Sequence, residues 1–176
     1  MIISETERDN QENKVNKVNR IKSEALFPVI IELIKNNQRA RLTVTGNSMS
    51  PFLKEGRDTV EFSAVDFSQI RRGDIVLIKR KCGYYVMHRV YKKAKDSFYM
   101  VGDAQQWIEG PLYPEQLIAI VTKVWRKGRE IDCNNVIWKL LSHIWLILRR
   151  FRYLIFGVYA RVKRIRNKFF RGAYLQ

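Results

Sequence analysis

Short runs rich in apolar residues, some of them alternating with polar residues, occupy the middle of the chain and predict β-strands. These runs cover residues 41–45, 58–62, 75–79, 84–91, 98–101 and 117–125. Gly, Pro, Asn, Asp and Ser residues lie between them, as expected of turns. The run at 75–79 is almost entirely apolar, which is typical of a strand buried on both faces. We therefore expect a mainly β fold, a barrel or sandwich of six or so short strands.

Helical periodicity appears on both sides of these runs. Ser23 can cap a helix that ends near Ile34, with Pro28 in its first turn and Asn36 and Asn37 as its stop. After residue 136, apolar residues recur at alternating steps of four and three, which predicts an amphipathic helix. They are Ile137, Leu141, Ile144, Leu148, Phe151, Ile155, Val158, Val162, Ile165 and Phe169.

Together these patterns divide the chain into three parts. Residues 1–22 are polar and predict a mobile tail. Residues 23–133 form the β-rich domain with its N-terminal helix. Residues 134–176 form a basic amphipathic appendage, which we expect the domain to fold without. No stretch of 18 uncharged apolar residues is present, so a conventional membrane span is not expected.

Charge is concentrated in the C-terminal part. The net charge is +16, and residues 126–176 hold 13 Lys and Arg against 2 Asp and Glu. A basic amphipathic helix with aromatic residues favours an anionic membrane surface as partner. The predicted membrane-binding residues are Trp138, Trp145, Arg149, Arg150, Arg152, Arg161, Lys163 and Arg164. The alternatives are a helix packed on the β domain or a coiled coil; no nucleic-acid recognition module is visible.

The stretch Gly46-Asn47-Ser48-Met49-Ser50-Pro51 predicts a tight turn at a strand end. Ser48 would then lie where its hydroxyl can point out of the sheet. By itself the stretch is equally consistent with an ordinary serine in a hairpin. Two later blocks carry further candidate chemistry: Tyr85-Val86-Met87-His88-Arg89-Val90, and Gly102-Asp103 followed by Pro111-Leu112-Tyr113.

With these blocks in this order, the chain resembles the superfamily that unites type I signal peptidases with LexA-type self-cleaving repressors. The resemblance covers about residues 40–130, and it implies a β-rich fold. In the common bacterial signal peptidases a lysine stands where this chain has His88. A histidine there resembles the endoplasmic-reticulum and archaeal branch, in which a serine, a histidine and an aspartate cooperate.

The resemblance implies that Ser48 is the nucleophile, His88 the general base and Asp103 the group that orients the imidazole. Glu109 is a weaker candidate for the acidic partner. An ordinary histidine would lose its activity as a base below about pH 6.5. Residues expected to shape the turn and the oxyanion site are Gly46, Asn47, Met49 and Pro51. Gly46 lacks the hydroxyl that many Gram-negative signal peptidases use there, so backbone amides, that of Ser48 included, would have to serve.

The expected function is therefore a serine endopeptidase that removes a leader or signal peptide from a precursor through an acyl-enzyme, without a cofactor or metal. The alternatives are a self-cleaving LexA-like switch and an inactive, membrane-docked adaptor for peptide precursors. Since the N-terminal span of signal peptidases is not seen, we expect a peripheral protein on the cytoplasmic face of the membrane.

Overall fold

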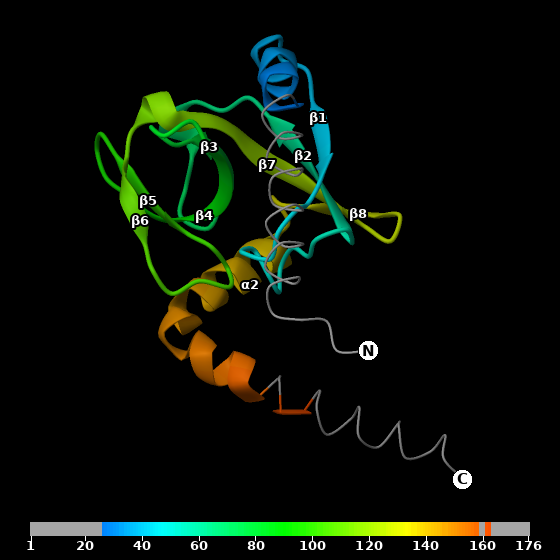
Figure 1. Ribbon diagram of the computed structural model, residues 1–176, viewed down its shortest axis with the longest axis vertical. Coiled ribbons are helices and arrows are strands. Elements are labelled where there is room, and N and C mark those ends of the chain that lie inside the picture. The colour runs from blue at the N-terminus through cyan, green and yellow to red at the C-terminus, as the bar shows by residue number, and fades with distance from the viewer. Residues whose placement is uncertain (1–25, 159–160, 163–176) are drawn as a thin grey trace, which may run out of the picture.

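The computed structural model describes residues 26–158 and 161–162. Its centre is an antiparallel sheet of eight strands in the order β1-β2-β7-β3-β4-β5-β6, with β8 paired to β7 (Figure 1). The strands are β1 (Ala40–Thr43), β2 (Asp58–Ser63), β3 (Ile75–Lys79), β4 (Tyr85–Lys93), β5 (Phe98–Val101), β6 (Glu109–Leu112), β7 (Leu117–Arg126) and β8 (Arg129–Asp132). Among these described strands, β1 and β6 do not pair with each other, so the sheet is not closed.

All six predicted strands are present, and the structure contains two further strands, β6 and β8, that the sequence did not predict. β6 contains Gly110 and Pro111, which are rare inside strands, and it lies at an edge, where a proline is tolerated. β8 forms a hairpin with β7 through Lys127 and Gly128, whose φ angles are 51° and 76°. Positive φ at both central residues is what a tight two-residue hairpin requires.

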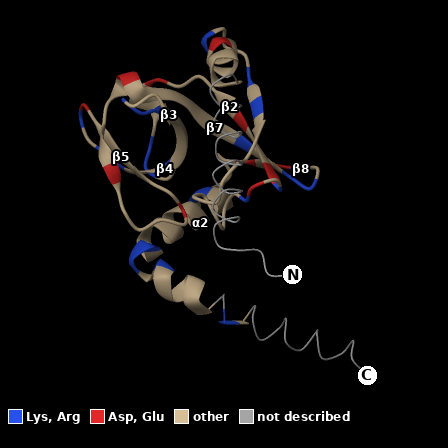
Figure 2. Ribbon diagram, viewed as in Figure 1, with Lys and Arg blue, Asp and Glu red and all other residues tan. Residues whose placement is uncertain are grey.

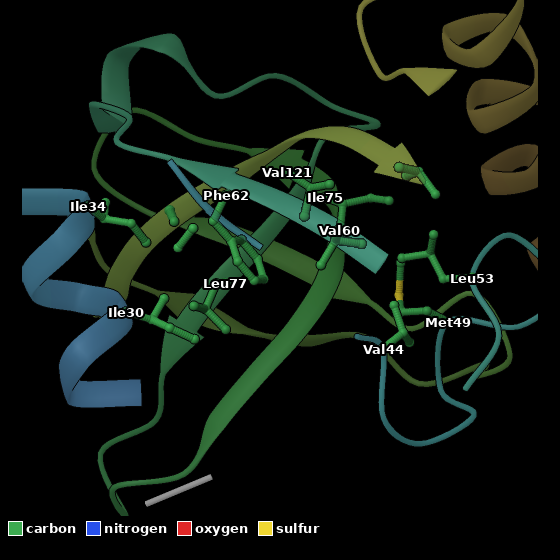
Figure 3. Close-up of a cluster of buried hydrophobic side chains, with 13 residues drawn as sticks. Ile30, Ile34, Val44, Met49, Leu53, Val60, Phe62, Ile75, Leu77 and Val121 are labelled. Atoms are coloured by element: carbon green, nitrogen blue, oxygen red, sulfur yellow. The ribbon is translucent and has the colours of Figure 1, made fainter. Parts of the chain in front are cut away.

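β3 is buried on both faces, as its sequence predicts. Ile75 and Leu77 belong to one hydrophobic core, whereas Val76 and Ile78 belong to another. The first core lies between the sheet, the N-terminal helix and the segment around Met49 (Figure 3). The second is built from side chains of β3, β4, β5 and β6 together with Ile70, and these strands form the curled half of the sheet in Figure 1.

The N-terminal helix covers residues 26–35 and buries Ile30 and Ile34 in the first core. It ends as predicted: Asn37 has a φ of 55°, and the Gln38 N–H donates to the Leu33 carbonyl at 2.9 Å. The proposed cap, Ser23, lies outside the described residues. Two short 3₁₀ turns, η1 (Phe67–Gln69) and η2 (Pro114–Gln116), precede β3 and β7.

The C-terminal helical segment begins with α2 (Val136–Ile147) and η3 (Leu148–Phe151), and residues 152–158 and 161–162 are also helical. The helix was predicted, but its packing face was not. Trp138, Ser142 and Trp145 face the domain, whereas most of the apolar seam is exposed, including Ile137, Leu141, Ile144 and Phe151. Periodicity could not decide which part of a broad apolar surface meets the domain. Ile165 and Phe169 lie outside the described residues.

Candidate active site

Ser48 lies in a turn that the first core anchors. Its neighbour Met49 and the nearby Leu53 are buried, and the Leu53 N–H donates to the Met49 carbonyl at 2.8 Å. Figure 3 shows both side chains at one end of the core, next to Val44. Burying a side chain such as Met49 contributes about 1.5–3 kcal/mol. The buried side chains of Met49 and Leu53 therefore fix the turn to the core, while Ser48 itself is only half-buried.

Gly46 allows the chain to enter this turn, because its φ is 76° and a side chain there would be strained. The Ser50 N–H closes the turn on the Asn47 carbonyl at 3.0 Å, and the Ser50–Pro51 peptide bond is cis. The Ser48 N–H donates no hydrogen bond to any described residue. The use of this N–H to bind an oxyanion stays a prediction.

The turn at residues 102–105 packs against the backbone of Ser48. The Ala104 N–H donates to the Ser48 carbonyl at 2.8 Å. A Cβ on Gly102 would lie 2.8 Å from that same oxygen and 2.6 Å from Oε1 of Gln105. No real Cβ approaches so closely, so only glycine lets these two turns meet. The Gly102-Asp103 block is thus in direct contact with the backbone of the Ser48 turn.

His88 lies on β4 opposite Val76 of β3, and its side chain is buried. Its Nδ1 has no hydrogen-bond partner among the described residues, and Oε2 of Glu109 lies 3.9 Å from it. Burial lowers the pKa of His88 from 6.5 to about 4; Glu109 opposes this shift, and Arg80 adds to it. The imidazole is therefore neutral at pH 7 and able to accept a proton.

Glu109 reaches His88 from the edge strand β6, but most of its bonding goes to Arg80. Nε and Nη2 of Arg80 donate to the two Glu109 oxygens at 2.5 and 2.6 Å. This contact raises the pKa of Arg80. Because the guanidinium compensates the carboxylate, Glu109 cannot restore an ordinary pKa to His88.

Asp103 is fully buried, and its carboxylate is bound by Arg89 rather than by His88. Arg89 donates from Nε to Oδ1 at 2.8 Å and from Nη2 to Oδ2 at 2.6 Å. Arg152 is a second cation, 4.0 Å from Oδ1. Asp103 acts on the pKa of His88 only as a weak, raising influence. Its role as the orienting member of a triad stays a prediction that these contacts do not support; the structure brings Glu109 to His88 instead.

The C-terminal helical segment completes this arrangement. Nε1 of Trp145 donates to the Asp103 carbonyl at 3.0 Å, and Nη1 of Arg152 donates to the carbonyls of Gly102 and Gln105 at 2.8 and 2.9 Å. Nη1 of Arg89 donates to the Ser142 hydroxyl at 2.8 Å. The helix therefore holds the turn at residues 102–105, which in turn supports Ser48.

Four of the predicted membrane-binding residues contact the domain. Arg152 is buried, the Arg149 guanidinium donates to the Gln106 carbonyl, and Trp145 faces the domain. Trp138 packs edge-on against Phe52, with ring centroids 5.4 Å apart. These four side chains are thus committed to the domain. Arg150 and Arg161 are exposed, and Lys163 and Arg164 lie outside the described residues.

Ser48 and His88 line the same cleft, which has a volume of about 580 Å³. Gln105 and Arg80 add polar groups to it. The rest of the lining is mostly apolar and comes from the N-terminal helix, the segment from β1 to Met49, β2, β3 and β4: Phe27, Leu42, Val44, Met49, Val60, Phe62, Leu77, Tyr85, Val86 and Met87. Such a lining suits apolar side chains of a bound peptide.

Two cleft residues escaped the sequence analysis. Oε1 of Gln105 is buried and has no hydrogen-bond partner among the described residues. Like the Ser48 carbonyl, it lies close to Gly102. Its only sequence signal was proximity to Gly102. Arg80 gave no signal, because its partner Glu109 lies 29 positions away and on a strand that was not predicted.

No protein-family model matches the chain, and no curated protein matches it either. Within residues 26–158 and 161–162, every helix is too short or too polar to cross a bilayer. The same residues contain no group of three His, Cys, Asp or Glu side chains placed to hold a metal ion.

Proposed function

We propose that the protein is a serine endopeptidase of the signal-peptidase and LexA-like kind, with the corresponding barrel-like fold, and that it removes a leader from a peptide precursor. The observation that carries this proposal is the shared cleft: a half-buried serine hydroxyl and a buried neutral histidine open into one apolar groove. A serine needs a neighbouring base to become a nucleophile, and a neutral imidazole is such a base.

The proposed reaction uses Ser48 and His88. Oγ of Ser48 attacks the scissile carbonyl, and His88 takes the hydroxyl proton and later passes it to the leaving amine. The Ser48 N–H donates to the oxyanion, and the Gln105 side-chain amide, which also faces the cleft, is a second candidate donor. Water then cleaves the acyl-enzyme. Glu109, held by Arg80, stabilises the imidazolium that forms during each step.

An extended peptide is the substrate that fits this groove. Among the described strands, β1 pairs only with β2, so its other edge is free, and Leu42, Thr43 and Val44 line the cleft. A peptide can add to such an edge by main-chain hydrogen bonds and place alternate side chains in the apolar lining. The family resemblance further implies that the substrate has small side chains next to the scissile bond.

One observation favours a second candidate, a peptide-binding protein without catalysis. Among the described residues, none forms a hydrogen bond with the Ser48 hydroxyl. Catalysis then requires that substrate binding bring Ser48 and His88 together. Catalytic hydrogen bonds are often long in the absence of substrate and shorten only in the complex. An inactive adaptor would never make this contact.

A fluorophosphonate probe, followed by intact mass spectrometry, separates these candidates. We expect one adduct on the wild-type protein, none on Ser48→Ala, and full labelling of the matched control Ser50→Ala. Labelling of Ser48→Ala at the wild-type rate would refute the assignment of the nucleophile, and an unlabelled wild type would favour the adaptor. Fragments released without any substrate would indicate the self-cleaving switch.

A further inference from the structure

The C-terminal helical segment has two opposite faces. Its inner face, with Trp138, Ser142, Trp145 and Arg152, contacts the domain. Its outer face carries large apolar side chains that contact little else; Ile137 and Ile147 are each 68% exposed. The outer face consists of Val136, Ile137, Leu140, Leu141, Ile144, Ile147, Phe151, Leu154, Val158 and Val162. A continuous apolar strip of this size marks a docking site.

The charge of the segment indicates what covers this outer face. Residues 133–176 contain ten Lys and Arg and no Asp or Glu. Figure 2 shows the described part of the segment in tan and blue only. Arg150 and Arg161 are both exposed. A partner for this face must therefore be apolar at its centre and acidic around it.

We propose that the outer face docks on the surface of an anionic bilayer, with the helical segment lying in the plane of the interface. The apolar strip enters the boundary between headgroups and acyl chains, and Arg150 and Arg161 meet acidic headgroups. A second copy of this chain fits less well, because pairing two such segments would bring like charges together without any acidic side chain to compensate them.

This docking would use different residues from those that the sequence favours. Trp138, Trp145, Arg149 and Arg152 are engaged with the domain, so the lipid-facing set is aliphatic, with Phe151 as its one described aromatic residue. The inner contacts stay intact when the outer face docks. Membrane binding and the proposed peptidase activity are therefore separable, and each can fail without the other.

The test is co-sedimentation of the full-length protein with vesicles made of equal parts phosphatidylglycerol and phosphatidylcholine. The variant Leu140→Glu/Ile147→Glu changes two outer-face side chains. The matched control Leu26→Glu/Val29→Glu places the same charges on exposed apolar positions of the N-terminal helix. We expect the first variant to lower vesicle partitioning at least about tenfold and the control to bind like the wild type, with binding weakened by salt.

Thermal melts and light scattering complete the experiment. All four substituted side chains are exposed, so the melting temperatures of both variants should stay within a few degrees of the wild type. Equal vesicle binding by both variants, or no binding by the wild type, would overturn the proposal. So would equally strong binding to pure phosphatidylcholine. A wild-type dimer that Leu140→Glu/Ile147→Glu converts to a monomer, without vesicle binding, would assign the face to a second copy instead.

Discussion

The backbone N–H of Ala104 donates a 2.8 Å hydrogen bond to the carbonyl oxygen of Ser48. This bond joins the turn that carries the proposed nucleophile to a turn that lies more than fifty residues later in the chain. The close approach is possible because the intervening Gly102 has no side chain. The position of Ser48 therefore depends on residues that take no part in the proposed chemistry.

Gly102→Ala is expected to lower turnover at least about tenfold and to destabilise the fold by about 1–3 kcal/mol. The new Cβ would lie 2.8 Å from the Ser48 carbonyl, so it would push the two turns apart. The matched control is Gly157→Ala, which has open space around it in a helix. Steady-state kinetics and urea unfolding measure both effects. If Gly102→Ala behaves like Gly157→Ala, the contact does not position Ser48.

The acid limb of the activity profile is expected near pH 4 rather than near pH 6.5, because burial lowers the pKa of His88 to about 4. Between those two pH values the unfolded chain binds a proton that the folded chain does not. Stability should therefore fall as the pH is lowered through that window. The rate of peptide cleavage against pH tests the first expectation. An NMR titration of His143→Gln, which leaves His88 as the single histidine, tests the pKa directly; a midpoint near 6.5 would mean that the ring is solvated.

Asp103→Asn and Glu109→Gln are expected to act on different properties. Asp103→Asn removes the charge that pairs with the buried Arg89, at a cost of about 3–5 kcal/mol in unfolding free energy. Glu109→Gln removes the carboxylate next to His88 and should lower turnover with little change in stability, since Glu109 is partly exposed. Comparing kcat with urea midpoints for both variants tests this. A stable but inactive Asp103→Asn variant would return Asp103 to the role that the sequence implies.

Removing residues 134–176 is expected to destabilise the β domain, although the sequence alone suggested that the domain would fold without them. Arg89 would lose the Ser142 hydroxyl, and the turn at residues 102–105 would lose Trp145 and Arg152. Trp145→Phe is the milder test and should cost about 1–3 kcal/mol, because it leaves the Asp103 carbonyl without its donor. Trp107→Phe, at an exposed position, is its matched control. Thermal melts identical to the wild type for the truncated chain would show that the segment is a true appendage.

The sequence predicted the parts of the fold that follow from local rules. Short apolar or alternating runs located six strands, the apolar run at 75–79 was buried on both faces, and Asn37 ended the N-terminal helix. The Gly46-Asn47 turn placed Ser48 correctly at the end of a strand region. These features depend on propensities and periods within a few residues of each other.

What the sequence missed depends on contacts between distant segments. The resemblance favoured Asp103 over Glu109 as the partner of His88, and no local pattern could test that preference. In the structure, Arg89, the neighbour of His88 in sequence, binds the Asp103 carboxylate. Glu109 lies near His88 because it is on β6, an edge strand whose composition is atypical. The inner face of α2 was missed for the same reason. Trp145 on this face donates to the backbone carbonyl of Asp103, in a loop far away in sequence. The periodicity of the helix carries no information about that loop.

The support of the Ser48 turn by the C-terminal segment also has a consequence for the order of synthesis. β2 cannot pair with β7 until residue 126 has been made, and Trp145 and Arg152 emerge from the ribosome later still. The proposed nucleophile, by contrast, precedes Trp145 by almost a hundred residues. A nascent chain arrested before residue 145 should therefore not react with the fluorophosphonate probe, whereas a released full-length chain should. Synthesis would then delay the proposed activity until residues 145–152 are in place, and a newly made copy could not cut its own growing chain.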